Sequence, residues 1–110
     1  MPFFLTRFSY TPEAWARLIK KPEDRREVAR AVVEKLGGKL HGFWYSFGQQ
    51  DGFVLIEAPD NVSAAAFSVG ISSSGSLRSS ETTVLLTVEE TIKMLEKAQG
   101  LPYRPPGANS

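Results

Sequence analysis

The chain has 110 residues, of which 42% are hydrophobic and 23% charged, so it can bury one core and is expected to form a single globular domain. Thirteen Lys and Arg against twelve Asp and Glu give a net charge of +1, which provides no electrostatic basis for a nucleic-acid or membrane partner. The sequence has no cysteine, which excludes disulfides, thiol nucleophiles and cysteine metal sites.

The N-terminal sequence, MPFFLTRF, carries a charge at Arg7 and lacks the uninterrupted apolar run and cleavage site of a signal peptide. No segment approaches the roughly 20 apolar residues that a membrane span needs. We therefore expect a cytoplasmic protein.

Strand and helix signals alternate along the first third of the chain. Residues 3–9 predict a strand, and Thr11-Pro12 predicts a helix start, because a hydroxyl caps free amides and proline suits the first turn. Pro22 interrupts the helical pattern, since it has no amide to donate. A second helical run follows and ends at Gly37-Gly38, with apolar residues on one side at Val28, Val32, Val33 and Leu36.

The segment from Gly42 to Asp60, GFWYSFGQQDGFVLIEAPD, predicts a β-hairpin that is apolar on both faces. Gly48 and Gly52 favour a tight reversal between its strands. A strand with one face in water alternates apolar and polar side chains, but FWY and FVLI place bulky side chains on both faces. The second face therefore needs a cover.

The remainder predicts a helix, a strand and a last helix. Asp60 or Asn61 can cap the first of these, the SSSGS stretch at 72–76 is a connection, and residues 77–86 form a strand. Thr87 and Glu90 match a capping box that opens the last helix, which ends near Gly100. The domain is thus expected to span residues 1–100, followed by a proline-rich tail over 101–110.

The order β-α-β-β-α-β with an extra C-terminal helix predicts a ferredoxin-like α+β sandwich, a four-stranded antiparallel sheet with both main helices on one face. The other apolar side would then expose Phe43, Tyr45, Phe53 and Leu55, an area of the size that monomers usually cover in an interface. Two such sheets packed face to face would form a dimeric α/β barrel with a central cavity. The expected partner is a second copy of the chain.

Two segments, GGKLHGFWYSFGQQDGFVLIEAPD and SETTVLLTVEETIKMLEKA, resemble the GYD domain family, small proteins of the dimeric α/β-barrel type. The resemblance extends over residues 3–98. The tyrosine of the family's motif would fall at Gln50, so any role of that phenol is absent here. The resemblance implies a dimeric barrel of two ferredoxin-like sheets, and it implies little about function because the family is largely uncharacterised.

Candidate catalytic residues come from the hairpin. If residues 48–50 form the turn, counting back pairs Tyr45 with Phe53 and His41 with Glu57. The imidazole of His41, the only histidine, would then share one wall with the Tyr45 phenol and the Glu57 carboxylate. Such a group can abstract a proton from an activated carbon acid, with His41 as base, Glu57 orienting it and Tyr45 stabilising an enolate or phenolate.

The same count pairs Phe43 with Leu55, so Phe43, Phe53 and Leu55 are the candidate ligand-binding residues of a cavity between facing sheets. The predicted function is the binding of a small apolar or aromatic molecule. Cofactor-independent proton transfer or monooxygenation is plausible by analogy with related barrels, and no cofactor is expected. The sequence does not decide whether the chain is an enzyme.

Other interpretations stay open. His41 can be an ordinary strand residue, and the dimer is then an interaction or regulatory module without a ligand cavity. Some dimeric barrels use a single histidine to ligate haem iron. RNA-recognition domains share this strand order, but Asp51 stands where they carry a basic residue. No metal site is expected, because Asp51, Glu57 and Asp60 lack ligand spacing.

Overall fold

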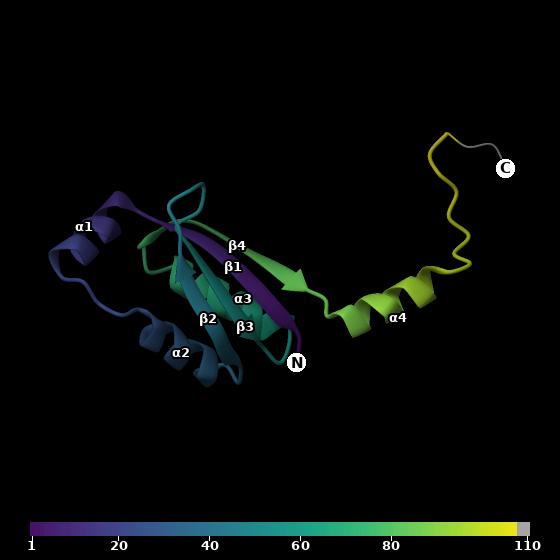
Figure 1. The fold of residues 1–110 in the computed structure, drawn as a ribbon, viewed down its shortest axis with the longest axis horizontal. Helices are drawn as coiled ribbons and strands as arrows, with labels where there is room; N and C mark the ends of the chain where they lie inside the picture. The colour runs from purple at the N-terminus through teal and green to yellow at the C-terminus, as the bar shows by residue number, and fades with distance from the viewer. Residues whose placement is uncertain (108–110) are drawn as a thin grey trace.

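The computed structural model describes residues 1–107 and shows a four-stranded antiparallel sheet, with a helical arm beyond one end of it (Figure 1). The elements in chain order are β1 (Phe3–Tyr10), α1 (Pro12–Lys20), α2 (Arg26–Lys35), β2 (Lys39–Tyr45), β3 (Gly52–Glu57), α3 (Asn61–Ser72), β4 (Leu77–Leu85) and α4 (Val88–Ala98). The strands lie in the order β2-β3-β1-β4. The predicted ferredoxin-like α+β fold is therefore confirmed, with α1 and α2 in the first crossover and α3 in the second.

The hydrophobic core lies between one face of the sheet and the helices. On β1 and β3 every second side chain points to it, and Phe4, Val54 and Ile56 are almost fully buried. From the helices, Val33 of α2 and Phe67 of α3 complete the same cluster. We call this side of the sheet the helix face.

Local sequence signals begin and end the helices where they were expected. The Thr11 hydroxyl accepts a hydrogen bond from the Ala14 amide, and the Asp60 carboxylate accepts one from the Ser63 amide. Thr87 and Glu90 form both hydrogen bonds of a capping box. Gly37, with φ of +83°, ends α2 in the left-handed conformation that glycine adopts without strain.

The other side of the sheet, which we call the open face, has no helix packed on it within residues 1–107. Strand register places alternate residues of the strands there: Phe3, Leu5, Arg7, Lys39, Gly42, Trp44, Phe53, Leu55, Glu57, Glu81, Thr83 and Leu85. Trp44 is half exposed, and Phe53 and Leu55 are partly exposed. An uncovered, largely apolar sheet face is thus a feature of the single chain, and of the four residues predicted for it only Phe53 and Leu55 lie there.

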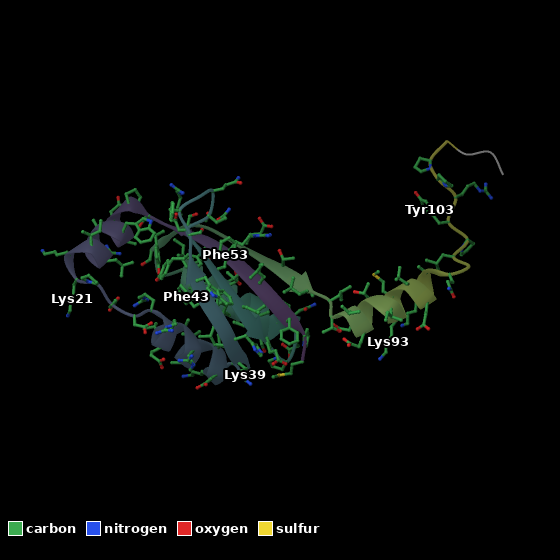
Figure 2. The ribbon with its side chains drawn as sticks, viewed as in Figure 1. Lys21, Lys39, Phe43, Phe53, Lys93 and Tyr103 are labelled. Atoms are coloured by element: carbon green, nitrogen blue, oxygen red, sulfur yellow. The ribbon has the colours of Figure 1, made fainter. Side chains whose placement is uncertain are left out.

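Helix α4 projects from the end of β4, away from the sheet (Figure 1), and it buries none of its side chains. Tyr103 lies on the tail beyond α4, still farther from the sheet (Figure 2), and residues 101–107 are all exposed. Residues 108–110 of the predicted tail lie outside the described residues. No helix within residues 1–107 has the length and apolar character needed to cross a membrane.

Truncation after Gly100 is expected to leave the melting temperature within about 2 °C of the full chain, because exposed residues at a terminus contribute little to folding. Thermal unfolding followed by circular dichroism measures the change. A drop of about 5 °C or more would show that Tyr103 or its neighbours dock on the folded domain or on a second copy.

Candidate functional site

A β-bulge in β2 sets the geometry of the candidate site. Leu40 pairs with Ile56 of β3, whereas Gly42 pairs with Leu55, so His41 is an extra residue in β2. An extra residue interrupts the alternation of a strand. Every later residue of β2 therefore points to the face opposite to the one that unbroken alternation would give.

The bulge makes the predicted hairpin pairing wrong. Phe43 pairs with Val54 and Tyr45 with Gly52, instead of with Leu55 and Phe53. Because Val54 belongs to the core, Phe43 and Tyr45 lie on the helix face. The Tyr45 phenol and the His41 imidazole are therefore on opposite sides of the sheet and do not share one wall.

His41 and Glu57 nevertheless meet on the open face. The His41 Nε2 lies 2.6 Å from the Glu57 Oε1, and both side chains are mostly shielded, with exposed fractions of 29% and 21%. The Phe3 ring packs against the imidazole with its centroid 5.2 Å away. When Nε2 donates to the carboxylate, Nδ1 is the basic nitrogen of the neutral ring. The bulge thus turns His41 towards the carboxylate that the sequence assigned to it.

Trp44 is a member of the open face that the sequence interpretation missed. It pairs with Phe53, and its ring covers Gly42, where an added Cβ would lie only 2.1 Å from the Trp44 Cη2. Glycine is therefore needed at position 42 for the ring to lie as it does. A glycine inside a strand is the one sequence signal that could have indicated the bulge.

The ligand-binding candidates are divided by the sheet. Phe53 and Leu55 lie on the open face as predicted, whereas Phe43 lies on the helix face next to the core (Figure 2). A second polar pair accompanies His41 and Glu57 on the open face: Arg7 donates to Glu81 at 2.7 Å and to Thr83 at 2.8 Å. The open face is thus largely apolar, with two paired sets of charged groups and with Lys39, opposite Glu57, at the end of β2.

Tyr45 belongs to an aromatic cluster at the other end of β2. Its hydroxyl lies 3.2 Å from that of Tyr10, and its ring contacts Phe8, Trp15 and Phe43. Partial burial, together with the hydrogen bond between the Tyr45 and Tyr10 hydroxyls, raises the pKa of the Tyr45 phenol above its ordinary value of 10.0, although Tyr45 is still 48% exposed. The phenol therefore stays protonated and can only act as a neutral hydrogen-bonding group.

Asp51 is a structural residue of the hairpin turn. Its Oδ2 accepts hydrogen bonds from the Tyr10 amide at 2.9 Å and from the Trp15 indole at 3.0 Å. The carboxylate therefore fixes the turn to the end of β1 and to α1, as expected for a turn aspartate. Within residues 1–107 no three His, Cys, Asp or Glu side chains gather closely enough to hold a metal ion.

Comparisons with known proteins agree on the fold and say little about chemistry. The sequence profile of the GYD domain family matches residues 4–95. A solved structure titled "crystal structure of FFRP-DM1" is similar over 78% of this chain and all of its own, with a TM-score of 0.50 and 13% identity. That similarity concerns the fold alone. No curated protein matches the sequence.

Tyr45→Phe should reduce the loss of stability at alkaline pH. The unfolded chain loses the phenol proton as the pH rises above about 10, while the folded chain keeps it, so the contribution of Tyr45 is full below pH 10 and declines above it. Urea unfolding from about pH 9 to 11 should therefore show a smaller decline in the variant than in the wild type.

Tyr103→Phe is the control for this measurement, because its ring is 75% exposed in the folded chain. The stability of Tyr103→Phe should decline with rising pH as that of the wild type does. Equal declines in the wild type and in Tyr45→Phe would contradict the raised pKa of the Tyr45 phenol.

Proposed function

The chain belongs to the GYD domain family, and we propose that it is a cytoplasmic homodimer that binds a small apolar or aromatic molecule between two facing open faces. The observation that carries this proposal is the open face itself, which is apolar, uncovered, and holds the hydrogen-bonded His41–Glu57 pair at its edge. The partner that we propose for this face is a second copy of the chain and not a nucleic acid.

The polar groups of the open face support burial in a dimer. Unpaired charges are costly to remove from water, but Arg7 is already paired with Glu81, and His41 with Glu57. The apolar side chains around them, Leu5, Trp44, Phe53 and Leu55 among them, would gain roughly 25 cal/mol for each Å² that becomes buried. Face-to-face packing would produce the dimeric α/β barrel that the family resemblance implies.

Helix α4 gives independent support for a second copy. Val88, Ile92 and Leu95 follow at spacings of four and three residues, so they form one apolar stripe, and each is at least half exposed in the single chain. An amphipathic helix of 11 residues is marginally stable alone and usually gains its stability from packing. Because α4 projects away from its own sheet, a partner subunit is the surface that it can reach (Figure 1).

The chemistry available at this site is general base catalysis by His41. Glu57 orients the imidazole through Nε2, and Nδ1 is then the nitrogen that can take a proton from an acidic carbon or phenol. The Tyr45 hydroxyl does not take part, because it lies on the helix face. Phe3, Trp44 and Phe53 would provide the apolar surroundings that an aromatic ligand requires.

A second candidate function is an interaction module without a ligand cavity. The exposed stripe of α4 favours it, since a helix of this kind can dock into an apolar groove of another protein. In this case the open faces would pack directly and His41–Glu57 would be a buried structural pair. The two functions differ in whether a small molecule stabilises the dimer.

Leu55→Asp should dissociate the dimer, because it places a charge at the centre of the open face while leaving the helix-face core intact. Sedimentation velocity should show the wild type as a dimer at about 10 µM and the variant as a folded monomer, with affinity reduced by roughly 100-fold or more. Val69→Asp, on the exposed surface of α3, is the control and should stay dimeric. A monomeric wild type would contradict the proposed assembly.

His41→Asn tests for chemistry at the site. An enzyme that uses His41 as a base should lose about 10²-fold or more in turnover while its dimer persists, whereas a binding protein should keep most of its affinity. Phenols, quinones and carbonyl compounds are first screened by thermal shift on the wild type, and the hits are then assayed for turnover. Thr83→Val, which alters the open face away from His41, is the control and should retain turnover.

The outcome of the screen also separates the two candidate functions. If none of these compounds raises the melting temperature of the wild type, ligand binding between the sheets is rejected in favour of the interaction module. A compound that still raises the melting temperature of Leu55→Asp must bind outside the dimer interface.

A further inference from the structure

A second candidate site lies on the opposite side of the sheet from His41. Helix α2 packs mainly over β2 and α3 mainly over β4, so the two helices cover the edge strands and leave space above the central ones. A cavity of about 280 Å³ fills this space, which we call the helix-side cavity. It is roughly nine times the ~30 Å³ that a water molecule takes up in the liquid, so it can hold about ten heavy atoms of a ligand.

The lining of the helix-side cavity is mainly apolar and comes from all four strands and both helices. Phe8, Phe43, Val54 and Leu77 form its floor on the sheet. Val28 and Val32 of α2 face Phe67 and Ile71 of α3 across it. The cavity is partly open to solvent, and its mainly apolar lining favours an apolar guest.

Gly70 helps to keep this cavity open. It lies inside α3, where glycine costs roughly 1 kcal/mol relative to alanine, and its φ is not positive, so the backbone does not require it. A Cβ added at Gly70 would meet no atom within 4 Å. Gly70 is itself exposed at the partly open wall of the cavity, so a larger side chain would fit there and would improve the helix.

The polar groups of the cavity gather at one end. β1 ends there, α2 begins there, and α3 connects there to β4, which brings together Tyr10, Arg25, Ser74 and Ser76. Arg25 is the only charged residue of the lining, and its partly exposed guanidinium is 3.0 Å from the Glu23 carboxylate. A ligand that enters the cavity would thus have an apolar body and a polar end next to a cation.

The same end opens into a wider, cationic cleft of about 650 Å³ between α1 and the start of α2. Tyr10, Arg25 and Ser76 line both spaces, which therefore adjoin. The cleft adds three further cations to Arg25, with Glu23 as the one acid in its lining: these are Arg17, Lys20 and Lys21. A positive cleft that adjoins an apolar cavity suits a negatively charged head on an apolar tail.

We propose that this chain binds an amphipathic anion, with an apolar tail of roughly ten heavy atoms in the helix-side cavity and a carboxylate or phosphate head in the cationic cleft. This site is separate from the proposed site at His41, because the sheet lies between them. It needs no second copy of the chain, since one chain supplies every lining residue.

The test measures binding of decanoate, decyl phosphate and decanol by isothermal titration calorimetry, below the concentrations at which they form micelles. Both anions should bind the wild type, and decanol should bind at least about tenfold more weakly because it lacks the charge that Arg25 and its neighbours recognise. Tighter binding of one anion identifies the head as carboxylate or phosphate. Absence of binding by both anions, or equal binding of decanol, would overturn the proposal.

Gly70→Leu tests the tail site without endangering the fold, because it replaces a mid-helix glycine with a good helix former in open space. The leucine should occupy part of the cavity and reduce the affinity for both anions by about tenfold or more. Ala66→Leu, an exposed position of the same helix outside the cavity lining, is the matched control and should bind as the wild type does. Equal binding by Gly70→Leu and Ala66→Leu would contradict the placement of the tail.

Two further variants separate this site from the one between the sheets. Arg25→Gln should reduce the preference for decanoate over decanol, whereas Arg30→Gln, on α2 but outside both linings, should preserve it. Leu55→Asp should keep full affinity for the anions even as a monomer. Loss of anion binding in Leu55→Asp would overturn the helix-side site and assign the ligand to the dimer interface.

Discussion

The extra residue at His41 decides which side of the sheet every later side chain of β2 occupies. If His41 paired with Leu55 in an unbroken ladder, Phe43 and Tyr45 would point to the open face, and Gly42 and Trp44 to the core. With the extra residue, Phe43 and Tyr45 pack beside Phe8, and Trp44 lies over Gly42 on the open face. The composition of the core, the apolar character of the open face and the contact between His41 and Glu57 all depend on this one insertion.

The sheet consequently separates two environments with different chemistry. On the open face His41 is paired with Glu57 and Arg7 with Glu81, Lys39 lies at the end of β2, and most of the surface between them is apolar, which suits close contact with another sheet. On the helix face the aromatic side chains border a cavity whose cations lie at one end. A mutation on one face can therefore leave the site on the other intact, which allows assembly and ligand binding to be tested independently.

The sequence predicted the features that depend on a few neighbouring residues. Capping by Thr11, Asp60 and Thr87 and the order of strands and helices along the chain follow from turn chemistry and periodicity, which act locally. The side of the sheet on which Phe43 lies could not be predicted in this way. One unrecognised extra residue inverts the predicted face of every later residue in a strand, and only Gly42 indicated the bulge. The helix-side cavity also could not be predicted from the sequence, because it depends on the distance between α2 and α3 on the sheet. The spacing of apolar residues within each helix does not determine that distance.

Assembly through the open faces would leave the helix-side cavity on the outside of the dimer. The helices would then form the outer layer of the barrel, and the cationic cleft, which lies between α1 and α2, would stay open to water. Arg25 and its neighbouring lysines need that access, because a charged head enters from solvent and keeps part of its hydration in a wide cleft. Helix α4 projects from the end of β4 and so would reach the partner without covering either cavity of its own chain (Figure 1). Dimerisation and anion binding are therefore compatible in one molecule, and neither uses a surface that the other requires.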